Sequence, residues 1–317
     1  MQIVHIEITP DSEGQRVDNF LLRELRNVPR SRVYRILRKG EVRVNGRRSK
    51  PTQRLQLGDV VRIPIEDEVK IAERIKPPAK VLRQLERSIL YEDNDILALN
   101  KPTGLAVHGG SGLSFGLIEC VRHMYPDLQR LELAHRLDRD TSGCILIAKN
   151  RKSIVRLHDL FRKRQIRKTY DLLVYGRWNK GDRSVRLSLL KFTTPAGERR
   201  VRADHEGKVA RTEFSIVEQI SDFTWLRARP YTGRTHQIRV HALACGKAIV
   251  GDNKYASDTQ LEFSARRGIQ RLCLHASSLS VPAAELTGTA ERVSMLKIEA
   301  PLPTSFVIAW KQLRRSR

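Results

Sequence analysis

The sequence predicts an α+β protein built from two domains. Its 317 residues exceed what one domain of ordinary size needs, and 40% of them are hydrophobic, as in globular proteins. Residues 65–80 carry four acidic and four basic residues and end near Pro77-Pro78, a proline pair that stops a helix and stiffens the chain. We therefore predict a first domain over 1–64, a linker over 65–80 and a second domain over 81–317.

The first domain is predicted to contain two helices followed by short strands. Apolar residues between 17 and 25 recur at helical spacing. A second helix is expected to begin at Pro29 and end at Gly40, because these residue types favour those positions. Asn45-Gly46 marks a hairpin turn, and residues 55–64 have the composition of a further strand.

The second of these helices is strongly basic. The whole chain has 59 Lys and Arg against 35 Asp and Glu, a net charge of +24, which points to an anionic partner. A basic helix beside a small β unit suits the phosphates and 2′-hydroxyls of folded RNA. An ordinary solvated face is the alternative, although the helix has no acidic residue to offset its charge. The candidate RNA-binding residues on this helix are Arg30, Arg32, Arg35, Arg38 and Lys39.

In the second domain, residues 88–101 are expected to form two short strands, and a glycine-rich loop follows them. Gly112–Gly116 matches the GxSxG pattern of a hydrolase nucleophile, with Ser114 at its centre. That arrangement needs a buried strand directly before it, whereas the residues from His108 onward have loop composition, so we interpret the match as chance. A loop that approaches a ligand is the better functional reading, and a plain structural loop remains the alternative. His108 is assigned to RNA binding.

Asp138 is the strongest candidate for a catalytic residue. We expect it on a loop and turn, 135–143, that leads into a buried strand at Cys144–Ala148. Arg136 and Arg139 flank it and favour the ionised form of its carboxylate. An ionised, partly desolvated carboxylate can act as a nucleophile or stabilise a cation. A structural Arg–Asp network is the alternative.

Two further candidates lie later in the chain. Residues 223–230 alternate like a strand, and the helix expected after them carries Arg239, which could reach a carboxylate or a phosphate. His236 and His241 are five residues apart and fall on different faces, so we expect hydrogen-bonding or core histidines rather than metal ligands. Tyr170 stands where the basic run in 162–176 enters a probable strand, a place that suits base stacking. A half-buried core tyrosine is the alternative.

Several classes of protein are disfavoured. No run of about 18 apolar residues and no secretory signal is visible, so we expect no membrane partner. The four cysteines are scattered along the sequence, which argues against a disulfide framework. We therefore expect the protein to be located in the reducing cytoplasm. No complete nucleotide-binding loop, metal motif or dimer-forming heptad appears, so we predict no cofactor, no metal and a monomer.

The motifs together resemble the RluA-type family of RNA pseudouridine synthases. The family's HRLDxxTSG signature reads HRLDRDTSG at 135–143, its Lys-x-Tyr element is Lys168-Thr169-Tyr170, and GRTHQIRVH occupies 233–241. NKPTGLAVHGG at 100–110 and RLCLHASSL at 271–279 match further expected stretches. The segments RVDNFLLREL, SRVYRILRKGEVRVNG and LGDVVRI in the first domain resemble the S4-type RNA-binding domain.

The resemblance implies a mixed, mainly antiparallel sheet with peripheral helices and a central cleft. It implies that Asp138 is the catalytic aspartate, paired with Arg239. Tyr170 would pack on the target base and could serve as general base, and Arg136 would fill the gap left by the flipped base. The implied reaction is isomerisation of specific uridines to pseudouridine in large-subunit (23S) ribosomal RNA. A sister subgroup with other rRNA or tRNA targets, and a non-catalytic RNA-binding ribosome-assembly protein, are the alternatives.

Overall fold

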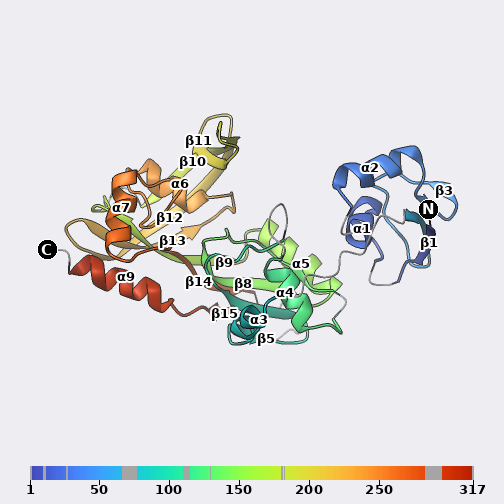
Figure 1. Ribbon diagram of the computed structural model, residues 1–317, viewed down its shortest axis with the longest axis horizontal. Helices are drawn as coiled ribbons and strands as arrows, with labels where there is room; N and C mark the ends of the chain where they lie inside the picture. The colour runs from blue at the N-terminus through green and yellow to red at the C-terminus, as the bar shows by residue number, and fades with distance from the viewer. Residues whose placement is uncertain are drawn as a thin grey trace. The chain divides into compact units, whose positions relative to one another are not determined.

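The computed structural model describes residues 2–9, 12–25, 28–65, 77–109, 115–128, 130–179, 181, 183–282 and 295–315. The chain divides into two compact units, Met1–Lys76 and Pro77–Arg317 (Figure 1). Residues 66–76, the middle of the predicted linker, and Ser114 lie outside the described residues. Within the described ranges, no helix is long and apolar enough to cross a membrane.

Both ends of the predicted linker belong to regular structure. Ile65 is the last residue of strand β4 (Val60–Ile65), and Pro78 is the N-cap of helix α3 (Ala79–Glu86). The proline pair therefore starts a helix where we expected it to stop one. Proline is tolerated there because the first turn of a helix leaves its N–H groups without intrahelical partners.

The first unit contains the predicted helices and hairpin. Pro29 and Gly40 bound the second helix as expected, and Gly40 adopts a left-handed conformation with φ of 70°. The apolar residues of 17–25 are buried in one core with those of the second helix. Two features differ from the prediction: β4 begins five residues later than expected, and the N-terminal strand β1 was not predicted. The sheet order is β1-β4-β2-β3, and the elements are β1 (Gln2–Glu7), α1 (Val17–Glu24), α2 (Arg30–Lys39), β2 (Arg43–Val44), β3 (Arg47–Arg48) and β4.

The described part of the second unit is built on one mixed sheet. Its order is β11-β10-β12-β13-β9-β14-β8-β6-β5, with β15 beside β14 and β7 beside β8. Only the β14–β8 pair is parallel among the described strands, so the expectation of a mainly antiparallel mixed sheet is confirmed. The strands are β5 (Ile89–Glu92), β6 (Ile96–Lys101), β7 (Glu132–Leu133), β8 (Ser142–Ala148), β9 (Arg167–Tyr175), β10 (Ser184–Thr193), β11 (Arg199–Ala203), β12 (Lys208–Gln219), β13 (Phe223–Pro230), β14 (Leu274–Val281) and β15 (Leu296–Glu299).

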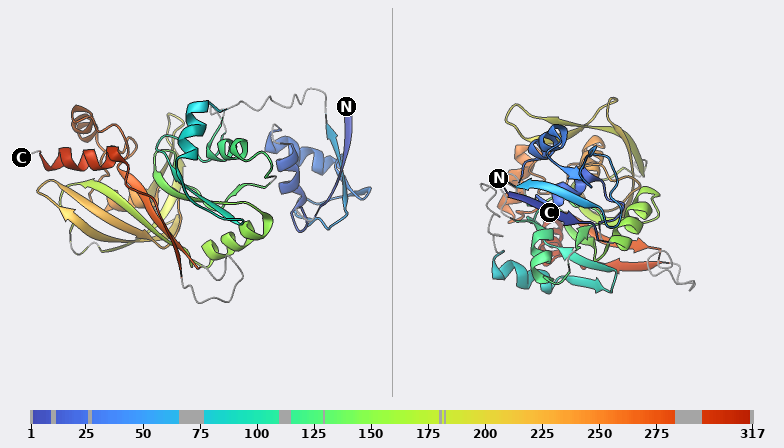
Figure 2. Two further views of the ribbon diagram at one scale, coloured as in Figure 1. Left: turned by 90° about the horizontal axis from the view of Figure 1, so that it is seen from below. Right: turned by 90° about the vertical axis from the view of Figure 1, so that its right-hand side faces the viewer.

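Helices cover both faces of this sheet (Figure 2). Alternate residues of β8 point to opposite faces. Ile145 and Ile147 pack with α3 and α4 (Leu117–Met124), while Cys144 and Leu146 pack with α5 (Arg151–Arg162). The other half of the sheet forms a third core with α6 (Gln237–Ala244) and α9 (Thr304–Arg314), and Phe263 of α7 (Asp258–Arg266) packs against it.

The central strands bring the three motifs together. β8 begins at Ser142, two residues earlier than predicted, and the loop that precedes it carries Asp138. Gly143 adopts φ of 115°, and a Cβ there would lie 2.2 Å from the Ala276 carbonyl oxygen, so only glycine allows β8 to meet β14 at this point. Tyr170 of β9 pairs with Ala276 on one side and with Ala228 of β13 on the other.

Candidate active site

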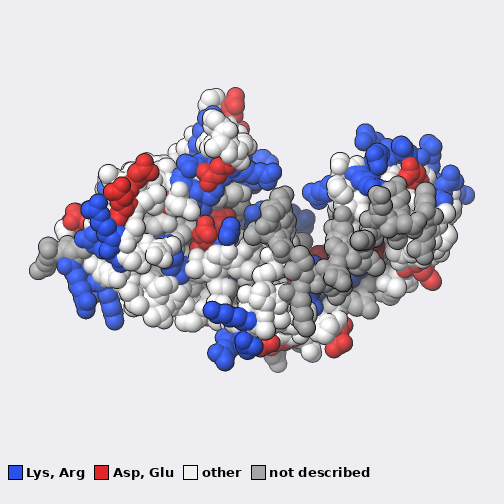
Figure 3. All heavy atoms as spheres, in the orientation of Figure 1, with Lys and Arg blue, Asp and Glu red and all other residues white. Residues whose placement is uncertain are grey.

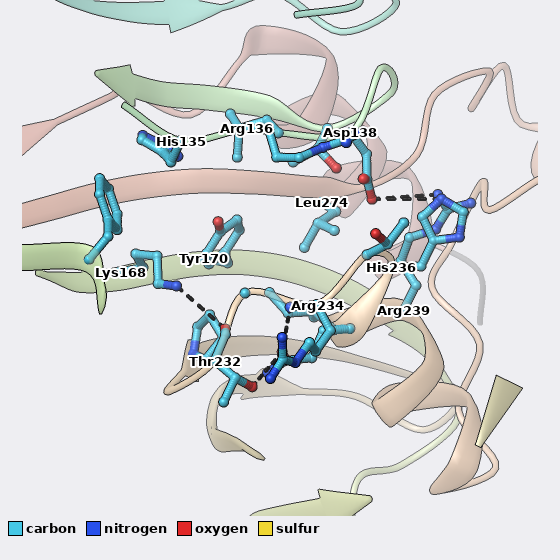
Figure 4. Close-up of a pocket in the computed structure, with 18 of the residues that line it drawn as sticks. His135, Arg136, Asp138, Lys168, Tyr170, Thr232, Arg234, His236, Arg239 and Leu274 are labelled. Carbon is cyan, nitrogen blue, oxygen red and sulfur yellow. Dashed lines mark hydrogen bonds and ion pairs between the residues drawn. The ribbon is translucent and has the colours of Figure 1, made fainter. Parts of the chain in front are cut away.

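A cavity of about 330 Å³ opens where the loop before β8, the strand β9 and the turn before α6 meet (Figure 4). Its size is in the range of small-ligand sites. Four predicted residues, drawn from three motifs, line it: Asp138, Arg136, Tyr170 and Arg239. Arg136 and Arg239, which are 103 residues apart in sequence, therefore share one cavity. No motif alone predicted this proximity.

The guanidinium of Arg239 is held mainly by an acid that the sequence did not reveal. Its Nε and Nη2 donate to the two carboxylate oxygens of Asp252, at 2.8 and 2.6 Å. Its Nη1 lies 3.8 Å from Oδ2 of Asp138. The side chain of Arg239 is 2% exposed and that of Asp252 is fully buried, whereas that of Asp138 is 20% exposed. Arg239 thus approaches Asp138, as expected, but its bidentate partner is Asp252.

Aromatic and imidazole groups complete this cluster. Tyr255 lies under Arg239, with the guanidinium carbon 5.0 Å from the ring centroid, and its hydroxyl is 2.7 Å from Nδ1 of His236. The Nε2 of His236 is 4.0 Å from Oδ2 of Asp138. Burial lowers the pKa of His236, although Asp138 opposes the shift, so the imidazole is neutral at neutral pH. His236 therefore forms a hydrogen bond, as predicted, and adds no full charge beside Asp138.

The arginines next to Asp138 in sequence do not pair with it in the described contacts. Arg139 turns away, and its Nε donates to the Gly104 carbonyl oxygen at 3.1 Å. Arg136 is exposed at the cavity. The expected flanking arginines are thus replaced by Arg239, which is about 100 residues further along the chain.

Lys101 links the loop that carries Asp138 to the loop after β6 by hydrogen bonds. Its side chain is buried, and its Nζ donates to the carbonyl oxygens of Pro102, Leu105 and Arg139 at 2.8–2.9 Å. The Thr103 hydroxyl adds a bond of 2.7 Å to the Asp140 carbonyl oxygen. This loop-to-loop attachment was missed in the sequence, where Lys101 reads as an ordinary strand-end lysine.

Tyr170 and Lys168 lie on the β9 side of the cavity. Burial, with a contribution from Asp138, raises the pKa of Tyr170, so its phenol stays protonated at neutral pH. Burial lowers the pKa of Lys168 to about 8, and its Nζ lies 3.4 Å from the Thr232 carbonyl oxygen. The cavity therefore offers a neutral aromatic ring beside an ammonium group.

The remaining predicted residues lie elsewhere. His108 is exposed on the loop after β6 and does not line the cavity. His241 is buried in α6, and its ring nitrogens have no hydrogen-bond partner in the described structure. No cluster that could hold a metal ion occurs among the residues described. Lys and Arg gather over α2 of the first unit, where Arg30, Arg35, Arg38 and Lys39 are exposed and Arg32 is half-buried (Figure 3).

Comparison with known proteins agrees with these observations. Residues 95–244 match the family described as RNA pseudouridylate synthase, and residues 15–61 match the S4 domain. The chain is 46% identical to "Ribosomal large subunit pseudouridine synthase C" of Escherichia coli, over 98% of this chain and 97% of the relative. It is 48% identical to the protein of that name from Haemophilus influenzae, over 86% and 85%.

A solved structure supports the same assignment. "Human RNA Pseudouridylate Synthase Domain Containing 4" is 25% identical, with a TM-score of 0.59, over 74% of this chain and 96% of that one. The family match over residues 95–244 contains Asp138, Tyr170 and Arg239, which line one cavity. The chain therefore belongs to the RNA pseudouridine synthase family and carries an S4 domain at its N-terminal end.

Proposed function

We propose that this protein converts specific uridines of large-subunit ribosomal RNA to pseudouridine, with Asp138 as the catalytic residue. The observation that carries the proposal is the position of Asp138: a partly exposed carboxylate in a cavity, next to a buried arginine whose charge is already matched by Asp252. The rRNA target rests on the names of relatives that align over nearly the whole chain.

The reaction places simple demands on the site. The N1–C1′ bond of uridine breaks, the base turns, and C5 bonds to C1′. C5 then loses its proton and N1 gains one, so no atoms or electrons are added overall. Either attack on the pyrimidine ring or stabilisation of positive charge at the sugar requires an ionised carboxylate. Asp138 has the exposure to reach the substrate, and Arg239 supports its negative charge.

The residues around Asp138 fit a flipped nucleotide. Removing a base from its stack costs a few kcal/mol, and stacking on an aromatic ring returns about 1–3 kcal/mol. Tyr170 offers such a ring inside the cavity, and Arg136 lies exposed at it, where it can fill the vacated stack. Because the Tyr170 phenol is held protonated, we assign it to packing on the base in preference to proton abstraction as a phenolate.

The first unit contributes RNA affinity in this proposal. Its helix α2 presents exposed basic side chains, and Glu41, just after the helix, lies 3.8 Å from Lys39. Phosphate contacts of this kind position a folded RNA without reading its bases. We infer that the protein acts as a monomer in the cytoplasm, where its free cysteines stay reduced.

The test compares Asp138→Asn with Asp127→Asn, the same substitution at an exposed turn that lines none of the described cavities. Transcribed large-subunit rRNA carrying 5-tritiated uridine is the substrate. We expect wild type and Asp127→Asn to release tritium, and Asp138→Asn to bind the RNA without releasing it. Release by purified Asp138→Asn would refute the catalytic assignment. RNA binding without release by wild type would support a non-catalytic assembly protein instead.

A further inference from the structure

We propose that a second cavity, beside the candidate active site, binds phosphodiester groups of the RNA strand next to the target uridine. This inference rests on the proposed function. The cavity has a volume of about 510 Å³ and lies over β10 and β12. It is called the arginine groove below, and its lining residues are Arg164, Ser184, Arg186, Val209, Arg211, Tyr231, Thr232 and Arg234.

Charge in the arginine groove is strongly one-sided. All four of its arginines are exposed, and none of its lining residues is acidic. Glu213, just beyond the lining, pairs with Arg211 at 2.8 Å and accepts a hydrogen bond from the Tyr231 hydroxyl, also at 2.8 Å. The guanidinium groups of the other three arginines have no hydrogen bond or ion pair in the described structure. One acid therefore faces four bases.

Two of these arginines occupy opposed positions on neighbouring strands. Arg186 of β10 and Arg211 of β12 are direct partners in the antiparallel register. Like charges placed opposite each other destabilise a sheet, so this pairing costs stability in the free protein. An anion bound between the two guanidinium groups would convert that repulsion into attraction. Binding of a ligand phosphate therefore accounts for the opposed arginines better than a contribution to the stability of the fold does.

The arginine groove is continuous with the candidate active site. Thr232 and Arg234 line both cavities, and Figure 4 shows them on the side of the cavity opposite Asp138. Arg234 also lines a third cavity of about 360 Å³ between β10 and the turn before α6. When a nucleotide is flipped toward Asp138, the adjacent nucleotides of the same RNA strand therefore lie next to Arg234.

The turn that separates the cavities is rigidly built. The Gln237 side chain is buried, and its Oε1 accepts from the Thr232 hydroxyl at 2.6 Å and from the Arg234 backbone N–H at 3.0 Å. Its Nε2 donates to Thr212 of β12 at 2.9 Å. Arg211 is fixed as well, with its guanidinium carbon 4.7 Å from the ring centroid of Tyr231. Preorganised donors of this kind favour a ligand with a fixed spacing of charges, as in an RNA backbone.

The test measures RNA binding and turnover of a double variant, Arg164→Gln with Arg186→Gln. Neither side chain lines the cavity that holds Asp138. The matched control is Arg315→Gln, an exposed arginine after α9 that lines none of the three cavities. Affinity for transcribed large-subunit rRNA is measured from 50 to 200 mM salt in an Asp138→Asn background. Tritium release is measured in the otherwise wild-type enzyme.

We expect the slope of log affinity against log salt to fall by about 0.7 for each lost contact with single-stranded phosphate, or about 1.4 for the double variant. KM for the rRNA should rise several-fold with kcat unchanged, and Arg186→Lys should retain most of the affinity because lysine still contacts phosphate.

A double variant that matches Arg315→Gln in slope and KM would overturn the proposal. Competition by inorganic phosphate, with no change in rRNA slope, would show a free-anion site and also overturn it. If wild type binds rRNA without turnover, the proposed function fails, while the binding slope still decides the role of the arginine groove.

Discussion

Replacing Asp252 by alanine tests the charge arrangement behind the candidate active site. The substitution removes both acceptors of the buried Arg239 guanidinium, and the acceptor for the Lys254 backbone N–H at 3.0 Å. Breaking a buried ion pair from one side costs about 3–5 kcal/mol. Each kcal/mol lowers the Tm of a unit of this size by about 2–4 °C, so we expect Asp252→Ala to lose about 6–20 °C.

The same substitution should also impair catalysis below the melting transition. With Asp252 gone, the nearest described carboxylate to Arg239 is that of Asp138, 3.8 Å away. A direct, desolvated pair between them would occupy the oxygens that the substrate needs. We therefore expect tritium release to fall at least tenfold at a temperature where circular dichroism shows a folded protein.

A double variant separates this explanation from general damage. Arg239→Met removes the buried positive charge that Asp252→Ala leaves without a partner. The double variant should therefore melt at a higher temperature than Asp252→Ala alone. Its tritium release should stay low, because Asp138 then lacks its cationic neighbour. The reasoning is refuted if Asp252→Ala melts within about 2 °C of wild type, or if the double variant melts below both single variants.

The other predictions concern binding and pH. Tyr170→Phe should keep most of the tritium release because the ring still stacks, whereas Tyr170→Ala should lose about 1–3 kcal/mol of stacking, seen as a higher KM; equal losses would contradict the packing role. Since burial lowers the pKa of Lys168 to about 8, raising the pH from 7 to 9 removes a positive charge from the cavity. The Kd for rRNA should rise over that range in wild type and rise less in Lys168→Met, and parallel curves would exclude this group. Replacing Arg35 and Arg38 of α2 by glutamine should reduce the salt slope of rRNA binding by about 0.7–0.9 per lost contact, and an unchanged slope would remove the RNA role of that helix.

Local features of the fold could be predicted because they depend on near neighbours in sequence. Pro29 and Gly40 bound a helix as expected, and the apolar run that forms β8 is buried throughout. Errors arose where local signals have two meanings. A proline pair ends one helix and begins another with equal ease, and only packing of α3 against the sheet selects the second outcome.

The candidate site was predictable only in part, for a different reason. Asp138, Tyr170 and Arg239 stand in recognisable motifs, so they could be named without knowledge of the fold. Asp252 follows a short apolar segment and belongs to no such motif. A buried arginine requires a counter-ion, yet the sequence offers 35 acids and no rule for choosing among them. Likewise, the three carbonyl partners of Lys101 come from two loops that meet only in the folded chain.

The position of Asp252 allows the site to meet two requirements that would otherwise conflict. A cleft that binds RNA needs many cations, but a catalytic carboxylate paired closely to one of them would lose its free oxygens. Asp252 removes this conflict because it takes both strong hydrogen bonds of Arg239 and leaves Asp138 with contacts of 3.8 and 4.0 Å. Among the residues that the structure describes, Glu213 on Arg211 is the only acid paired with an arginine of the groove, so the charge of the other three stays available to phosphate. One buried acid, Asp252, thus separates Arg239, which we propose supports the carboxylate of Asp138, from the groove arginines, which we propose hold the substrate.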